Sequence, residues 1–209
     1  MQIDIIFIIA IVTMSVVIHE VSHGYAALFL GDRTAKMAGR LTLNPMRHID
    51  MVGTIIVPLV MYLFAGFLFG WAKPVPYNPS NFHGNQRKGT AIVAAAGAAS
   101  NLLIALVFAL WLRFSVVFDV GQAFMEITVI IIILNILLAV FNLLPIPPLD
   151  GSRVLFSLLP TRFLYIQAFI ERYWLALIIL IIFFGSIIIF PLVGFIYGIL
   201  TGLPFPYLI

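Results

Sequence analysis

The chain of 209 residues lacks cysteine and has few charged residues. Without cysteine it can form neither disulfides nor thiolate metal sites. Charged side chains make up 9% of the residues, whereas a typical soluble domain has about 25%. Hydrophobic residues reach 63%, the mean hydropathy is +1.18, and no stretch is polar enough for a soluble domain. We therefore expect a single integral membrane domain over residues 1–209.

The few charges are mostly basic, and they lie between the apolar segments. Eleven Lys and Arg residues against eight Asp and Glu residues give a net charge of +3 and an isoelectric point near 9.4. Because the basic residues cluster in loops, they indicate a membrane orientation and not nucleic-acid binding. The first apolar run carries Asp4 and has no basic n-region, so it is not expected to be a cleaved signal peptide.

Long apolar runs predict an all-α polytopic membrane protein. Residues 3–30, 90–112 and 122–142 are each long enough to span roughly 30 Å of hydrocarbon at about 1.5 Å per residue. Residues 51–70 and 173–201 are also apolar, but glycine and proline interrupt both. The expected fold is a bundle of about 4–6 transmembrane or re-entrant helices. Whether 173–201 forms one span or two stays open.

Between these runs the pattern changes. Residues 34–44 partly alternate polar and apolar side chains, which predicts a short membrane-associated β-hairpin. The three prolines of residues 71–79 predict an extended strand or an irregular segment. The domain is therefore expected to run in this order: a helix at 3–30; a β-hairpin, a re-entrant segment and a strand within 31–90; a span at 90–112; a span within 122–151; and a surface helix with one or two C-terminal spans within 152–209.

The most informative motif, His19-Glu20-Val21-Ser22-His23, lies inside the first apolar run. Histidines at i and i+4 share one helix face, so both imidazoles can reach one zinc ion. Glu20 is placed as the general base for a water at that metal. The alternative is coincidence or a satisfied polar cluster. Because polar groups are costly inside hydrocarbon, the motif's location favours a functional site.

A catalytic zinc ion needs a third protein ligand and one open position. Asp150 is the strongest candidate because it follows an unwound, Pro-rich stretch at the end of an apolar helix, beside Gly151. Its alternative role is ordinary turn chemistry, which Asp-Gly-Ser often provides. The other candidates lie in polar or terminal contexts or near helix ends: Asp4, Asp32, Asp50, Asp119, His48, His83, Glu126 and Glu171.

Three motifs together resemble the site-2 proteases, which are intramembrane zinc metalloproteases. They are His19-Glu20-x-x-His23, Gly97-x-x-x-Asn101, and the segment Asn142-Leu-Leu-Pro-Ile-Pro-Pro-Leu-Asp150-Gly151. The segments at 39–50 and 70–79 are similar to those of the compact bacterial and archaeal branch. That branch lacks the PDZ or CBS modules of larger members. Because it is bacterial and archaeal, the resemblance implies a location in a prokaryotic cell membrane.

The resemblance implies one zinc ion (Zn2+) per chain, with His19, His23 and Asp150 as ligands and Glu20 as the general base. It also implies that Asn142 lies at the active site, where it helps to hold substrate or the developing oxyanion. The alternative for Asn142 is a helix-breaking residue that caps the unwound segment.

Asn101 is expected to hydrogen-bond between helices, with substrate contact as the other role considered. The small-residue face formed by Ala94, Gly97, Ala98 and Asn101 should let the His helix come close. The implied partners are transmembrane protein substrates and the lipid bilayer, and a homo-oligomer is left open.

The two metal motifs must meet at one depth, which constrains the topology. His23 and Asp150 both lie near carboxyl ends of helices, so those ends should face the same side. This requires residues 51–70 to be re-entrant. Nine of ten loop cations then share one side, against five and five for a full crossing, and the positive-inside rule places that side in the cytoplasm. The nine are Arg33, Lys36, Arg40, Arg47, Lys73, Arg87, Lys88, Arg153 and Arg162, with Arg113 opposite. The amino terminus is expected outside.

The main functional hypothesis is peptide-bond hydrolysis in or near transmembrane segments. The segments at 34–44 and 71–79 offer an edge for pairing with an extended substrate, although a purely structural hairpin is an equal alternative. A metal or ion transporter would also use intramembrane His and carboxylate groups, but it predicts polar residues spaced along the spans. A catalytically inactive scaffold predicts a damaged motif, whereas Glu20 is intact.

Overall fold

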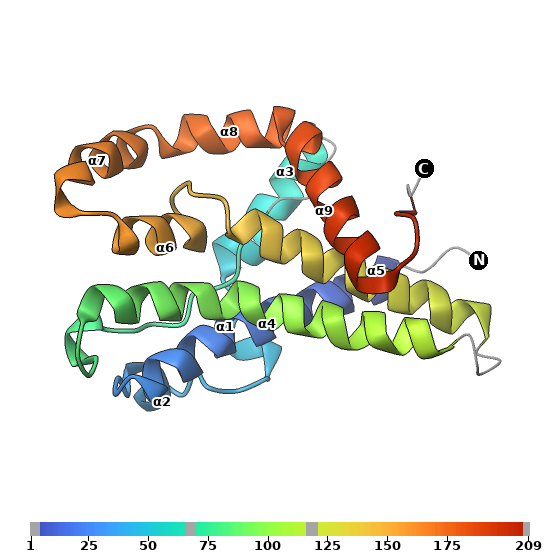
Figure 1. Ribbon diagram of the computed structural model, residues 1–209, viewed down its shortest axis with the longest axis horizontal. Coiled ribbons are helices and arrows are strands. Elements are labelled where there is room, and N and C mark those ends of the chain that lie inside the picture. Colours follow the sequence, from blue (N-terminus) through green and yellow to red (C-terminus); the bar gives the residue numbers. More distant parts are fainter. Residues whose placement is uncertain (1–4, 66–69, 116–120, 207–209) are drawn as a thin grey trace.

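Figure 1 shows the computed structural model of the protein, which describes residues 5–65, 70–115 and 121–206. Three long helices run side by side and form its centre. Each is long and apolar enough to cross a membrane, as predicted. They are α1 (Ile5–Phe29), α4 (Gln86–Ser115) and α5 (Gln122–Asn142).

Helix α4 packs against both α1 and α5, and small side chains allow this. Ala94 and Ala98 are buried on the half of α4 that faces α1, so the predicted small-residue face is confirmed. Ala105 and Ala109, further along α4, belong to one buried cluster with Ile136 of α5 and with residues of the C-terminal helix α9 (Ser186–Thr201). The core therefore lies between α4, α5 and α9.

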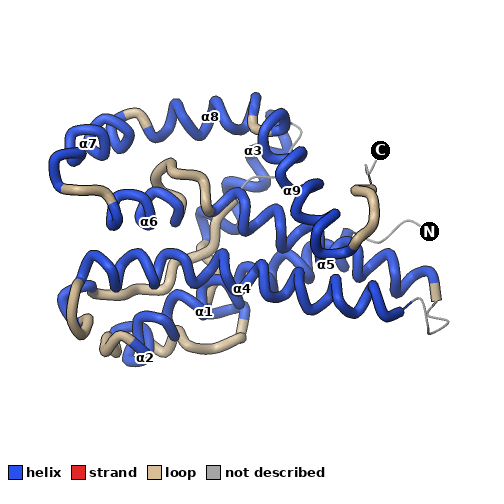
Figure 2. Tube along the Cα trace, in the orientation of Figure 1, coloured by secondary structure: helices blue, strands red, loops and turns tan. Residues whose placement is uncertain are grey.

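No β-hairpin forms at 34–44, and the described residues contain no strand (Figure 2). Residues Thr34–Met37 form a helical turn, α2, and Gly39, two residues beyond it, has a φ of 64°. The turn forms because the Asp32 carboxylate accepts hydrogen bonds from both the N–H and the hydroxyl of Thr34. A local side-chain contact thus overrides the weak alternation on which the hairpin prediction rested.

Residues 71–78 are extended but do not form the predicted strand. Pro74 and Pro76 have no N–H to donate to a ladder. The Arg40 guanidinium donates hydrogen bonds to the carbonyls of Lys73 and Pro74, at 2.7 and 3.3 Å, which a neighbouring strand would otherwise use. A buried arginine therefore takes the place of a pairing strand.

The apolar segment after residue 50 returns to its own start. It begins as a π-helix, Met51–Ile56, and continues as α3, Val57–Ala65. The Trp71 N–H then donates to the Gly53 carbonyl at 3.0 Å, and the Thr54 hydroxyl donates to the Trp71 carbonyl at 3.0 Å. These two hydrogen bonds hold Trp71 against the start of the segment, and whether the segment is re-entrant stays a prediction.

After α5, the chain forms shorter helices that lie over one side of the central three (Figure 1). Residues 173–201 form two helices that meet at Gly185, and Pro191 lies inside the second. The Arg87 side chain ties this region to α4 by donating to the carbonyls of Phe156 and Leu159. The shorter helices are α6 (Asp150–Leu158), α7 (Leu164–Arg172) and α8 (Trp174–Phe184), with a 3-10 turn at Thr161–Phe163.

Asp32, just past α1, is a fully buried hub that joins two loops. Besides the two bonds from Thr34, it accepts hydrogen bonds from the Asn78 N–H and the Asn81 side-chain amide, each at 2.7 Å. Burial by itself would raise the pKa of the Asp32 carboxyl, but these donors, which favour the charged form, hold that pKa below its usual range.

Replacing Asp32 with Asn should destabilise the protein by about 1–3 kcal/mol near neutral pH, because a hydrogen-bonded charge is lost. A depressed folded-state pKa means that this stability is present above the usual Asp pKa and is lost as pH falls through the folded-state value. The difference between wild type and Asp32→Asn should therefore shrink as pH falls below the usual Asp pKa, measured by thermal unfolding in detergent. The exposed Glu171→Gln is the control, and a pH-independent difference at Asp32 would refute the assignment.

Candidate metal centre

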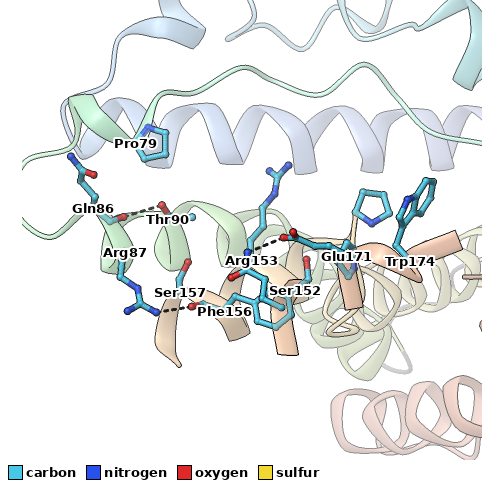
Figure 3. A pocket seen from close by; sticks show the side chains of 13 residues that line it. Pro79, Gln86, Arg87, Thr90, Ser152, Arg153, Phe156, Ser157, Glu171 and Trp174 are labelled. Atoms are coloured by element: carbon cyan, nitrogen blue, oxygen red, sulfur yellow. Dashed lines mark hydrogen bonds between the residues drawn. The ribbon is translucent and has the colours of Figure 1, made fainter. Parts of the chain in front are cut away.

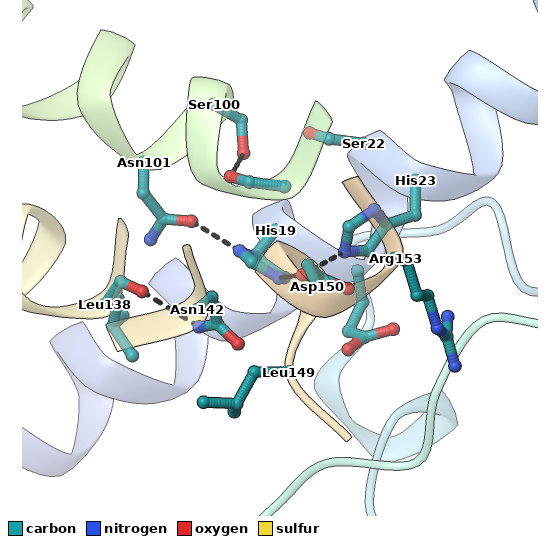
Figure 4. Close-up of polar contacts among 12 residues, drawn as sticks. His19, Ser22, His23, Ser100, Asn101, Leu138, Asn142, Leu149, Asp150 and Arg153 are labelled. Carbon is teal, nitrogen blue, oxygen red and sulfur yellow. Dashed lines mark hydrogen bonds and ion pairs between the residues drawn. The ribbon is translucent and has the colours of Figure 1, made fainter. Parts of the chain in front are cut away.

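The two motif histidines lie buried on one face of α1. His19 and His23 are 6% and 7% exposed, and their rings meet edge to face with centroids 4.6 Å apart. The i, i+4 spacing produces this arrangement, because residues four apart on a helix lie one above the other. Figure 4 shows both rings pointing toward Asp150. The pairing inferred from the motif is therefore present in the fold.

Asp150, the first residue of α6, reaches the same point although it lies 131 positions after His19 in the chain. Its Oδ2 lies 3.0 Å from His19 Nε2 and 3.1 Å from His23 Nε2. The irregular segment that follows α5 folds back tightly here. A Cβ at Gly151 would lie 2.1 Å from the Leu143 carbonyl oxygen, so glycine is required beside the carboxylate.

The hydrogen bonds around the two rings fix their tautomers. His23 Nδ1 is 2.7 Å from the Val93 carbonyl, which can only accept, so this nitrogen carries the proton. His19 Nδ1 is 2.8 Å from Asn101 Oδ1, which assigns the same tautomer. Both Nε2 lone pairs then face the Asp150 carboxylate.

Three acceptors that converge in this way repel one another unless a proton or a metal ion lies between them. The ligand atoms of His19, His23 and Asp150 all lie within 4.8 Å of one another. Two imidazoles and one carboxylate are a donor set that suits zinc, with a fourth position left for water or substrate. The Nδ1 hydrogen bonds are the partners that metal-bound histidines normally have. The residues present therefore fit the predicted ion.

Gly97 of α4 lies directly against the two imidazoles. A Cβ there would be 2.5 Å from His19 Nε2 and 2.6 Å from His23 Nε2. The backbone of α4 consequently covers the site on this side, and no side chain fits between the helix and the rings. The small-residue pattern of α4 thus serves the metal centre as well as helix packing.

Glu20 extends from α1 toward the extended segment at 71–78. Its Oε2 accepts a hydrogen bond from the Val75 N–H at 2.8 Å, and the residue is half-buried. Gly24, one turn further on, allows the close approach, since a Cβ there would meet the side chains of Leu41 and Val75. The segment therefore orients the carboxylate next to the histidines.

Two further predicted residues lie nearby. The Asn142 amide donates to the Leu138 carbonyl at 2.9 Å within α5 (Figure 4), so its active-site role stays a prediction. Asn101 is fully buried and links α1 to α5: it accepts from His19, and its amide donates to Asn135 Oδ1 at 3.0 Å. The predicted interhelical bond is confirmed, while substrate contact by Asn101 stays untested.

The residues set aside as ligands have other contacts. Asp50 accepts from the Gly53 N–H and the Trp71 indole, and His48 Nε2 bonds to the Thr42 carbonyl. The His83 ring lies against Gly31. Glu126 and Glu171 each accept from a glutamine four residues earlier in their helices. Asp4 and Asp119 lie outside the described residues.

Sequence reasoning missed Asn135 and Ser15, which join the hydrogen bonds behind His19. The sequence contained a signal for each of these two residues. Asn135 is a lone amide in the middle of an apolar helix, and Ser15 lies four residues before His19 on the same face of α1.

A cavity of about 740 Å³ opens beside the site (Figure 3). Ser152 and Arg153, which follow Asp150 and Gly151, line it together with the start of α4 and residues of α6 and α7. Pro147 and Pro148 of the irregular segment form part of its wall. The cavity thus lies next to the segment that carries Asp150.

Comparisons with known proteins agree with this geometry. The model of peptidase family M50 matches residues 115–185, which include α5 and Asp150. One curated relative, the "Putative zinc metalloprotease YwhC" of Bacillus subtilis (strain 168), is 37% identical over 196 residues, or 90% of this chain and 86% of the relative. The chain belongs to peptidase family M50. This is the site-2 protease family, as its motifs predicted, and the compact form agrees as well.

More distant members of the family come from mycobacteria. The proteins called "Putative zinc metalloprotease Rip2" from Mycolicibacterium smegmatis and Mycobacterium tuberculosis (strain H37Rv) are 32% and 30% identical over 155 residues. Those matches cover 72% of this chain but only 56% of each relative. No solved structure matches the chain. Family M50 membership, together with the three apolar helices, makes the chain a membrane-integral peptidase.

Substituting Gly97 with Ala should weaken metal binding, although Gly→Ala inside a helix ordinarily stabilises by about 1 kcal/mol. The added methyl group displaces both imidazoles, so we expect at least about a tenfold loss of zinc affinity, measured by chelator competition on the purified protein. Gly194→Ala is the matched control, because the atoms nearest to a Cβ there belong to Phe205 and lie at 3.4 Å or more. Equal zinc affinity in the two variants would contradict the close approach of α4.

Proposed function

We propose that the protein is a zinc-dependent endopeptidase that hydrolyses peptide bonds in or near transmembrane segments of membrane-protein substrates. One observation carries the proposal. Two imidazoles and a carboxylate converge within 4.8 Å inside a helix bundle of family M50, and both imidazoles present Nε2 to the carboxylate. The relatives' names support zinc as the metal.

In the proposed reaction, His19, His23 and Asp150 hold one zinc ion per chain. The ion would supply a Lewis acid that polarises the scissile carbonyl and makes water a stronger nucleophile. Glu20 accepts the proton of the attacking water and delivers it to the leaving nitrogen. The Val75 N–H holds one oxygen of Glu20, so the carboxylate is positioned before substrate arrives. Asn142, at the end of α5, is proposed to hold the substrate or the oxyanion.

Water reaches the site, in this proposal, through the cavity beside Asp150. The cavity is lined by Arg87, Arg153 and Glu171, which are side chains that water solvates well. Substrate pairing along 71–78 is less well supported, because the hydrogen-bonding groups of that segment are largely engaged. The N–H groups of Lys73, Val75 and Asn78 donate to His48, Glu20 and Asp32.

The two other hypotheses are not favoured. A transporter would need polar side chains distributed along its helices. Here the buried polar groups of α1, α4 and α5 gather around His19 at one level, with Thr128 as an exception that bonds its own helix. An inactive scaffold has no need of an intact Glu20 that the fold orients beside the histidines.

We further propose that the amino terminus lies outside the cell and that the site lies toward the cytoplasm. The return of Trp71 to Gly53 supports a re-entrant 51–70 segment. With that topology nine of the ten loop cations lie on one side, which the positive-inside rule assigns to the cytoplasm. The relatives from Bacillus and the mycobacteria are bacterial, which supports a bacterial cell membrane.

Glu20→Gln should abolish proteolysis while zinc stays bound. The amide cannot accept the water proton, so we expect cleavage of a model transmembrane substrate in detergent to fall by at least about 10²–10⁴-fold. Zinc content should match wild type, because Glu20 is not one of the three converging ligands. Unchanged cleavage would point to a contaminating protease, and zinc-free wild-type protein would refute the proposed function.

The absence of native cysteine allows a direct test of the orientation. Gly121 directly precedes α5 and has free space where a side chain would lie, and Lys88 is exposed near the start of α4. The variants Gly121→Cys and Lys88→Cys therefore place single thiols at opposite ends of the bundle. In intact cells, a membrane-impermeant maleimide should label Gly121→Cys and spare Lys88→Cys until the cells are permeabilised. The reverse labelling would overturn the proposed topology.

A further inference from the structure

Behind the candidate metal site, four side chains from three helices form a ring in which three hydrogen bonds link His19, Asn101, Asn135 and Ser15, and one turn of α1 closes it. His19 Nδ1 bonds to Asn101 Oδ1 at 2.8 Å, and the Asn101 amide donates to Asn135 Oδ1 at 3.0 Å. The Asn135 amide in turn donates to the Ser15 hydroxyl at 3.0 Å and to the Ile131 carbonyl at 2.9 Å. Ser15 lies one helical turn before His19, so the ring returns to α1.

Each bond in this ring has only one consistent direction. The Ile131 carbonyl accepts and cannot donate, so the Asn135 amide nitrogen must face it and Asn135 Oδ1 must face Asn101. The Asn101 amide nitrogen then points to Asn135, and its oxygen points to His19. That oxygen requires the proton on His19 Nδ1, which leaves the Nε2 lone pair toward Asp150. The orientation of Asn135 on α5 thus determines the tautomer of His19, and Asn101 is the residue between them.

We propose that Asn135 and Ser15 are positioning residues that fix the orientation of Asn101 and, through it, the metal-binding tautomer of His19. The proposal rests on the proposed metal site. Asn135 and Asn101 are fully buried and Ser15 is 5% exposed, so none of the three is offered to solvent. The hydrogen bond on the second nitrogen of a ligating histidine sets both its ring orientation and its basicity.

General helix packing does not account for this arrangement. Thr128, which is also buried on α5, shows how a buried polar group in this helix is otherwise satisfied: its hydroxyl donates to the Phe124 carbonyl within the helix. The Ile131 carbonyl satisfies one N–H of Asn135 in the same way, but the amide has a second donor and an acceptor. These two groups reach Ser15 of α1 and Asn101 of α4, at the level of His19.

Asn135→Leu tests the proposal without touching a ligand. An Asn101 amide that has lost its Asn135 acceptor can turn its nitrogen toward His19, so we expect zinc affinity to fall by about ten- to hundredfold in chelator competition. The absorption bands of the cobalt(II)-loaded protein should shift as well, because they report the ligand geometry. Thr128→Val is the matched control; it removes a buried hydroxyl from the same helix and should retain wild-type affinity and spectrum.

Rescue by Asn101→Asp separates positioning from packing. A carboxylate presents an acceptor at both oxygens, so it needs no partner to orient it toward His19. The double variant Asn101→Asp/Asn135→Leu should therefore recover most of the zinc affinity lost in Asn135→Leu. Absence of rescue, or wild-type zinc affinity and cobalt spectrum in Asn135→Leu, would overturn the inference while leaving the zinc site in place.

Ser15→Ala provides a milder variant if Asn135→Leu does not fold. Asn135 then keeps its bond to Ile131, so a smaller loss of zinc affinity in the same direction is expected, and an unchanged affinity would count against the proposal. Wild-type protein that binds neither zinc nor cobalt would overturn the proposed function together with this inference.

Discussion

The structure depends on bringing two imidazoles and a carboxylate together inside an apolar bundle. Buried polar groups of this kind destabilise a fold unless each one is satisfied. His19 and Asp150 are 131 positions apart in the chain, yet their ligand atoms lie 3.0 Å from each other. This contact requires the carboxyl end of α1 and the start of α6 to meet at one level. The re-entrant path proposed above for the segment after residue 50 would make that topology available.

Helix α4 supports the site mainly because its residues near the site have small side chains or none. Gly97 leaves room for both imidazoles, and alanines on either side let α1 and α5 approach. The same helix supplies the Val93 carbonyl and the Asn101 amide, which accept the Nδ1 protons of His23 and His19. The small side chains of α4 thus serve both close packing and tautomer selection, because they bring the Val93 carbonyl and the Asn101 side chain within hydrogen-bonding distance of the rings.

The sequence was most informative where local spacing determines geometry. The His19–His23 spacing, the apolar lengths of the three spans and the Pro-rich break before Asp150 each predicted what the structure contains. The β-hairpin prediction was wrong because a single side chain, Asp32, stabilises a helical turn that the alternation at 34–44 does not indicate. The ring through Asn135 could not be derived because it requires the register of α5 against α4, which periodicity alone does not determine.

The loops on the side of α2 form one unit with the candidate base, and this explains their polar composition. Asp32 holds one end of the extended segment through Asn78, and the His48 carbonyl accepts from Lys73 near the other end. Val75, between them, donates to Glu20. A carboxylate on a helix would otherwise sample several rotamers, so an extended segment fixed at both ends restricts it at low entropic cost. The irregular backbone at 71–78 is therefore part of the site and not merely a connection between helices.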